Sequence, residues 1–215
     1  MKRFWASAFL MLGMIGMVTA QSDANAVKLL KSVSQKYGAY KTMSMDVTLT
    51  IENLESKNKE ELKGKVKIKG SKFNLDFSQQ TVICDGKTMW IYLKDVNEVQ
   101  VSNFDPKEEM FTPDKIFKLA EKDFGCLMGE KMTSNGKTIQ VIELTPNDKS
   151  ASYSKIKLYI NTASNTIEKG VVYDKSAIHY TYAIKSFSAN PTLSDSLFTF
   201  NKANYDGVDV IDLRE

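Results

Sequence analysis

Histidine is nearly absent from this sequence. Of its 215 residues only His179 is a histidine, which excludes a metal site built from several histidines and leaves a single candidate for a histidine general base. His179 lies in an alternating pattern beside Tyr180 and Tyr182, which favours a structural strand residue over a catalytic one. A Cys84–His179 nucleophile pair has no local support. We therefore expect no catalytic residue, no metal and no cofactor, and we do not predict an enzyme.

Motifs of nucleotide and hydrolase sites are missing too. There is no Gly-x-Ser-x-Gly elbow, no phosphate-binding loop, no Cys-x-x-Cys pair and no dinucleotide fingerprint. Cysteine is scarce, with Cys84 and Cys126 as the two in the chain. An oxidising compartment permits a disulfide between them, but both lie in apolar, strand-like segments, so two buried thiols are the alternative.

Long apolar runs are confined to the start of the chain. Lys2 and Arg3 precede an apolar stretch over 4–18, and Val18-Thr19-Ala20 supplies the small residues of a cleavage site. A stretch of about fifteen residues is shorter than the roughly 20 that span a bilayer. We predict a signal peptide over 1–20, a single domain over 21–215, and export from the cytoplasm.

A large excess of charge of one sign is also lacking. Cleavage after Ala20 removes two basic groups and no acid, and leaves 27 Lys and Arg against 26 Asp and Glu. Surfaces that bind nucleic acid usually carry a clear basic excess. We therefore expect no nucleic-acid partner.

The sequence is rich in alternating apolar and polar residues. An amphipathic helix capped by Ser22 or Asp23 opens the domain, and from Ser44 the period changes to two, which predicts antiparallel strands with one apolar face. The predicted strands are 44–51, 62–69, 72–77, one ending at Cys84, 88–93, 124–132, 138–145, 155–161, 166–173, 177–187 and 197–201.

A second helix is predicted from Thr112-Pro113-Asp114, a hydroxyl cap followed by proline in the first turn. About ten or eleven strands with short connections favour a mostly β fold with a single strongly curved antiparallel sheet. The two helices must cover its concave apolar face. The pattern by itself favours a core filled by the protein's own side chains, with a hollow between sheet and helices as the alternative.

Several segments together resemble one family. The run Cys84-Asp85-Gly86-Lys87-Thr88-Met89-Trp90-Ile91-Tyr92 is similar to a hairpin of the periplasmic lipoprotein carriers of LolA type. The Lys-rich strand running into 69–75, the segment 111–117 and the closing stretches 195–200 and 207–212 resemble that family in the same order. The resemblance covers essentially the whole domain.

This resemblance implies an unclosed β-barrel of about ten or eleven strands, with helices lidding its concave face. It implies a periplasmic, monomeric chaperone that binds the acyl chains of triacylated lipoproteins. The partners implied are an inner-membrane ABC lipoprotein-release complex and an outer-membrane acceptor. The family carries an arginine–proline pair before the third strand, and the arginine holds the lid. This sequence has Lys69-Gly70 there, so either lid closure differs or the alignment slips by one residue.

The alternation then nominates the residues that face the cavity, with Trp90 and Tyr92 facing outward. The predicted lipid-binding residues are Met45, Val47, Leu49, Ile51, Val66, Ile68, Phe73, Leu75, Phe77, Met89 and Ile91 on strands, and Ile116, Phe117 and Leu119 on the underside of the lid. Two alternatives stay open, a carrier or sensor of another amphiphile such as a glycolipid, and an interaction module with a filled core.

Overall fold

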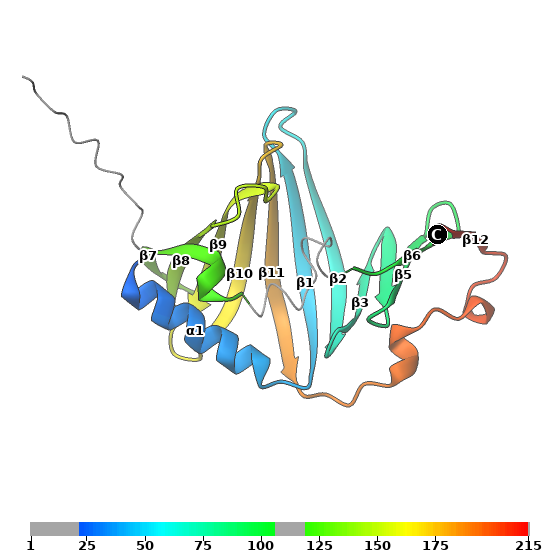
Figure 1. Cartoon of the computed structure of the whole chain (residues 1–215), viewed down its shortest axis with the longest axis horizontal. Coiled ribbons are helices and arrows are strands. Elements are labelled where there is room, and N and C mark those ends of the chain that lie inside the picture. Colours follow the sequence, from blue (N-terminus) through cyan, green and yellow to red (C-terminus); the bar gives the residue numbers. More distant parts are fainter. Residues whose placement is uncertain (1–21, 106–118, 215) are drawn as a thin grey trace, which may run out of the picture.

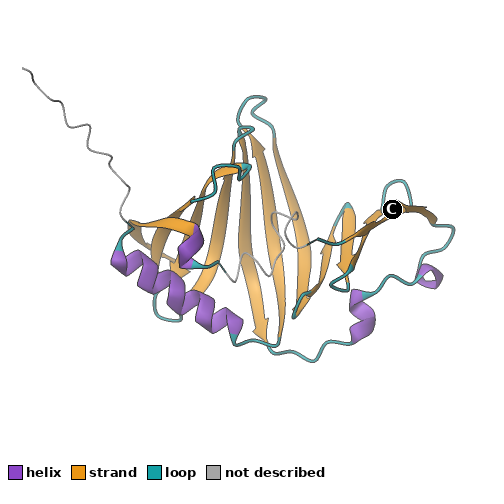
Figure 2. Ribbon diagram, in the orientation of Figure 1, coloured by secondary structure: helices purple, strands orange, loops and turns teal. Residues whose placement is uncertain are grey.

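The computed structural model describes residues 22–105 and 119–214, which form a single curved sheet with one α-helix against its concave face (Figures 1 and 2). The signal peptide predicted over 1–20 lies outside the described residues. The helix predicted from Thr112 also lies outside them, together with Ile116 and Phe117. Leu119 is described and precedes the 3-10 turn η1.

Most of the secondary-structure elements are β-strands. Their bounds are α1 Ala24–Gly38, β1 Thr42–Asn53, β2 Lys59–Lys69, β3 Lys72–Phe77, β4 Gln80–Cys84, β5 Thr88–Leu93, β6 Glu98–Asn103, η1 Glu121–Asp123, β7 Phe124–Ser134, β8 Lys137–Pro146, β9 Tyr153–Asn161, β10 Thr166–Asp174, β11 Ile178–Ala189, η2 Asp195–Phe198, η3 Lys202–Asn204 and β12 Asp209–Asp212.

The sheet has twelve strands in the order β12-β6-β5-β4-β3-β2-β1-β11-β10-β9-β8-β7. The edge strands β12 and β7 lie at opposite ends of this order, so the sheet is unclosed, as the family resemblance implies (Figure 1). The central pairing joins β1 to β11, which brings segments far apart in the chain side by side. A register shift in this pair after Asp46 leaves Lys185 as an extra residue on β11, and such a bulge increases local twist.

Three details of the predicted sheet are wrong. The strand predicted over 197–201 is absent from the described structure, where the 3-10 turn η2 extends to Phe198. The side-chain amide of Asn74 donates a hydrogen bond to the Leu197 carbonyl at 2.7 Å, so this carbonyl is bonded to a side chain and not to a neighbouring strand. The predicted antiparallel arrangement fails at β12, which pairs with β6 in parallel after the chain crosses the sheet. The sequence prediction also missed β6 itself.

Helix α1 begins where the sequence predicts. The Asp23 carboxylate accepts hydrogen bonds from the backbone N–H groups of Asn25 and Ala26, at 2.7 and 3.3 Å. Its buried face consists of Ala26, Leu30, Val33 and Tyr37. These residues join the main hydrophobic core, which also includes buried side chains of β1–β4 and β7–β10.

The opposite, convex face carries a second and smaller core. Val99 and Val101 of β6 pack there with Val208, and Trp90 and Tyr92 of β5 lie against them. Tyr92 meets Tyr205 of the C-terminal segment edge to face, with ring centroids 4.7 Å apart. Trp90 and Tyr92 therefore point away from the concave face, as the alternation predicts, and the C-terminal segment covers them.

Both cysteines are buried, and no disulfide joins Cys84 to Cys126. The structure thus supports the second of the two alternatives for these residues. Within the described ranges, no helix combines the length and apolar character needed to cross a membrane.

Candidate functional site

Strand pairing arranges the concave side chains in rows that run across the sheet. In one row Tyr182 of β11 faces Leu49 of β1, which in turn faces Leu62 of β2. In a parallel row Met45 is level with Val66, and Val66 with Leu75. Residues two apart along each strand share a face, so these rows form a continuous apolar surface.

Six of the predicted lipid-binding residues lie fully within the core. These are Met45, Val47, Val66, Ile68, Phe73 and Phe77. Phe77 lies over Gly64 on the neighbouring strand, so closely that a Cβ at Gly64 would come within 2.4 Å of the ring. For these side chains the filled-core interpretation holds, because the protein's own residues already cover them.

The remaining predicted strand residues are less covered. Leu49, Leu75 and Met89 are partly buried and pack at the margin of the core. Ile51 and Ile91 are also partly buried and share the face of Leu49 and Met89 by alternation. Leu119 is partly buried against the same core, and its carbonyl accepts a hydrogen bond from the Ser34 hydroxyl of α1 at 2.6 Å.

Sequence reasoning missed part of this surface. Tyr180, Tyr182 and Ile184 of β11 lie on the same face and are also partly buried. Their alternation in the sequence is the signal that could have found them. His179 of the same strand points the other way and meets Tyr173 at 4.4 Å between ring centroids. We name the concave apolar patch as the partly buried residues Leu49, Leu62, Leu75, Val82, Met89, Tyr180, Tyr182 and Ile184.

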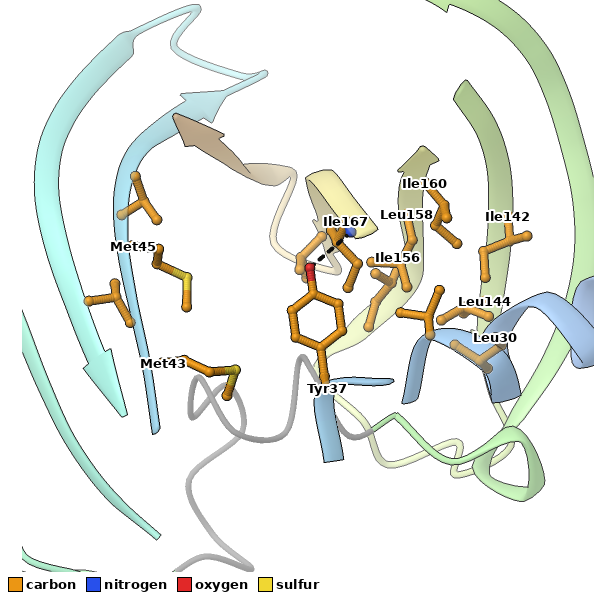
Figure 3. Packing of buried hydrophobic residues seen from close by; sticks show 14 of the residues in the cluster. Leu30, Tyr37, Met43, Met45, Ile142, Leu144, Ile156, Leu158, Ile160 and Ile167 are labelled. Carbon is orange, nitrogen blue, oxygen red and sulfur yellow. Dashed lines mark hydrogen bonds between the residues drawn. The ribbon is translucent and has the colours of Figure 1, made fainter. Parts of the chain in front are cut away.

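Helix α1 covers the part of the concave face that is formed by β8 and β9. Leu30 and Tyr37 approach Ile142, Leu144, Ile156 and Leu158, as Figure 3 shows. The Tyr37 hydroxyl accepts a hydrogen bond from the backbone N–H of Ile167 at 3.0 Å. Burial raises the pKa of Tyr37 to about 12, so this phenol stays neutral. The helix is thus tied to β10, whereas the concave apolar patch lies on β1–β5 and β11.

The Lys69-Gly70 pair does not face this patch. Lys69 reaches the C-terminal segment instead, with its Nζ 3.2 Å from the Asp195 carboxylate. Gly70 forms the turn between β2 and β3 at φ +63°, a conformation that proline, fixed near −65°, does not adopt. The arginine–proline arrangement that the resemblance implies is therefore incompatible with this turn.

The convex face differs in character from the concave one. A groove of about 630 Å³ lies over β11, β1, β2 and β3, and its charged lining residues are Asp46, Lys63, Lys65, Asp76, Lys94 and Lys185. Lys94 pairs with Asp76 at 2.7 Å and, together with Thr81, holds the pKa of that carboxyl below its ordinary value against the effect of burial. Polar and apolar side chains are thus segregated to opposite faces of the same strands.

An open, curved sheet with an apolar concave face that is partly covered by a helix is the architecture of an unclosed β-barrel. Residues 39–201 match the family described as outer membrane lipoprotein carrier protein LolA, and the chain belongs to this family. It is a family of carrier proteins rather than enzymes. The resemblance to the LolA-type carriers that the sequence indicated is thus confirmed.

One curated relative is an uncharacterized protein of Methanocaldococcus jannaschii, 32% identical over 161 residues. The match covers 72% of this chain but 46% of that protein, so the chain spans about half the length of the relative.

Solved structures share the fold at low sequence identity. An uncharacterized conserved protein from Thermus thermophilus is similar with a TM-score of 0.57 and 13% identity, covering 87% of this chain and 99% of that one. LprF from Mycobacterium bovis is similar with a TM-score of 0.51 and 13% identity, covering 81% and 98%. The lipoprotein LppX from Mycobacterium tuberculosis is similar with a TM-score of 0.50 and 11% identity, covering 80% and 99%.

Proposed function

We propose that this protein is an exported, periplasmic chaperone that binds the acyl chains of lipoproteins and carries them from the inner to the outer membrane. The proposal includes cleavage of the signal peptide over 1–20. It also includes an inner-membrane ABC complex as the donor of triacylated lipoproteins and an outer-membrane protein as the acceptor. Membership of the lipoprotein carrier family supports this assignment.

The observation that carries the proposal is the concave apolar patch. Its side chains remain partly exposed although they border a large buried core, so they offer apolar surface that a ligand can cover. Burial is worth about 0.8 kcal/mol per methylene, and a sixteen-carbon chain exposed to water therefore forfeits on the order of 12 kcal/mol. A lipoprotein needs such a surface to cross an aqueous compartment.

The proposed lipid-binding residues fall into two groups. Leu49, Ile51, Leu75, Met89 and Ile91 would contact acyl chains directly, with Ile116, Phe117 and Leu119 completing the site from the lid. The buried Met45, Val47, Val66, Ile68, Phe73 and Phe77 would shape the floor beneath them. Methionine side chains adapt readily to chains of different shape.

Transfer to the acceptor without an energy source such as ATP requires that the carrier bind the acyl chains with limited affinity. An acceptor with a better-fitting cavity then draws the lipid away, because the carrier's closed and open states are nearly balanced. A surface in which patch residues keep part of their exposure is consistent with such a hold.

The proposal is tested by adding the mature protein to membranes that display triacylated lipoproteins and contain the ABC release complex. We expect a soluble one-to-one complex of carrier and lipoprotein. Mass spectrometry of the lipid extracted from this complex identifies the cargo. Recovery of a glycolipid in place of a lipoprotein would favour the alternative of another amphiphile, and an empty protein would contradict both.

A further inference from the structure

Two tyrosines, Tyr180 and Tyr182, bring hydroxyl groups to the concave apolar patch. Tyr182 projects from β11 level with Leu49 on one side and Gly170 on the other. Tyr180 shares its face two residues earlier, and both rings pack against the main core. The Tyr182 hydroxyl is therefore placed near the middle of the sheet, among apolar neighbours.

The hydroxyl of Tyr182 differs in its hydrogen bonding from that of Tyr37. Tyr37 accepts a hydrogen bond from the Ile167 N–H, whereas no described residue forms a hydrogen bond with the Tyr182 hydroxyl. Burial, and then the neighbouring Tyr180, raise the pKa of Tyr182 to about 12. The phenol is therefore neutral, and although Tyr182 is partly buried its hydroxyl has no protein partner among the described residues.

The surroundings limit the ligand group that this donor fits. The lysines of β2, such as Lys63 and Lys65, alternate with the concave residues and line the convex groove instead. His179 also lies on the other face. With no cation from β2 or β11 beside Tyr182, a charged headgroup would lose its hydration without compensation. A neutral acceptor, such as a carbonyl oxygen, fits this environment.

The residue level with Tyr182 on β10 is a glycine, Gly170. This glycine occupies the concave position next to Tyr182 on β10 and has no side chain to cover it. A Cβ there would meet only Leu158 Cδ2, at the ordinary contact distance of 3.6 Å. Gly170 is itself buried, so the β10 position level with Tyr182 carries no side chain but is covered by the protein.

We propose that the Tyr182 hydroxyl donates a hydrogen bond to an ester carbonyl of the bound acyl lipid and so fixes how far the chains enter the patch. This inference rests on the proposed function, since it needs an acyl ligand on the concave face. It adds a polar anchor, and with it a preference for acyl esters over chains that lack a carbonyl.

The test measures the affinity of two matched ligands for each of two proteins. A synthetic triacylated lipopeptide and its counterpart with ether bonds in place of the two O-esters are titrated against the wild type and Tyr182→Phe. We expect the wild type to prefer the ester ligand by about threefold to tenfold, the range for one hydrogen bond. Tyr182→Phe should lose this preference and bind the ether ligand as the wild type does. Tyr92→Phe, on the convex face, should keep it.

The possible failures are distinguishable. If the wild type binds neither ligand, the proposed function and this inference both fall. If it binds both and Tyr182→Phe retains the ester preference, the inference alone is wrong. Thermal unfolding of the ligand-free variant gives a second check, because removing an unpaired hydroxyl should leave the melting temperature unchanged or raised. A lowered melting temperature would show that the hydroxyl already serves the fold and would overturn the inference.

Discussion

The hydroxyl of Tyr37 accepts a hydrogen bond from the backbone N–H of Ile167, 130 residues further along the chain. It joins the only α-helix of the described residues to a bulged position of β10, where the register shifts between Ile167 and Lys169. The N–H of Ile167, next to this irregularity, thus has a side chain of the covering helix as its acceptor.

Changing Tyr37 to Phe should therefore lower the free energy of unfolding. The ring and its packing remain, but the Ile167 N–H is left buried and unpaired, which costs about 1–3 kcal/mol. Urea denaturation of the two proteins measures the difference. Tyr40→Phe is a suitable control, because Tyr40 packs beside Tyr37 at a centroid distance of 5.8 Å without a comparable backbone contact. Equal stability of Tyr37→Phe and the wild type would contradict this assignment.

A second prediction concerns the stability of the protein when Gly64 is replaced by alanine. An added Cβ would lie 2.4 Å from the Phe77 ring and 2.9 Å from the Asp76 carbonyl oxygen, so the strands or the ring must move. We expect Gly64→Ala to cost about 1–3 kcal/mol, as overpacking does. Gly38 has no atom within 4 Å of its Cβ position, and Gly38→Ala should be neutral or slightly stabilising. The melting temperatures of both variants decide this, and a Gly64→Ala protein as stable as Gly38→Ala would show that the contact relaxes freely.

The contact of Lys69 and Lys72 with Asp195 should depend on pH. Hydrogen bonds from Lys72 and then Lys69 hold the pKa of Asp195 below its ordinary value. A lowered carboxyl pKa means that the contact contributes fully above the ordinary value near pH 4 and is lost as the pH falls through the lowered one. Amide exchange in the segment 193–198 should accelerate in Asp195→Asn at neutral pH, with little change in global unfolding, since the pair is exposed.

Salt provides the control for this pair. High ionic strength screens exposed charges, so it should accelerate exchange in the wild type and leave Asp195→Asn almost unchanged. Identical exchange in the two proteins at low salt would show that the Asn74 contact with Leu197 is sufficient to hold the segment.

Much of the fold was predictable because the concave strands alternate strictly. Residues such as Val66 and Ile68 between lysines specify one apolar face, and the Asp-Gly turn after Cys84 specifies a hairpin. Strand β12 escaped prediction because its four residues, Asp209–Asp212, are exposed on both faces and are held by parallel pairing to β6. That pairing depends on where the C-terminal segment crosses the sheet, which no local pattern encodes.

The sequence predicted on which face of the sheet the candidate site lies, but not how deeply each of its residues is buried. Alternation placed Val66 and Leu75 on the same side of the sheet, and the structure places them in one row. It did not distinguish buried Val66 from partly buried Leu75, because coverage depends on α1 and on the curvature of the whole sheet. Tyr182 was missed although it alternates with Tyr180 and Ile184, because alternation alone does not say which of the two faces of β11 is the concave one.

The central claim is that the concave apolar patch holds the acyl chains, and paired charge substitutions test it most directly. Leu49→Asp and Thr50→Asp place the same charge at adjacent positions of β1, the first on the patch and the second on the opposite face. Both proteins should fold by circular dichroism. Leu49→Asp, and likewise Leu75→Asp, should lose the soluble lipoprotein complex in the release assay, while Thr50→Asp retains it. A folded Leu49→Asp protein that takes up lipoprotein as the wild type does would contradict the account.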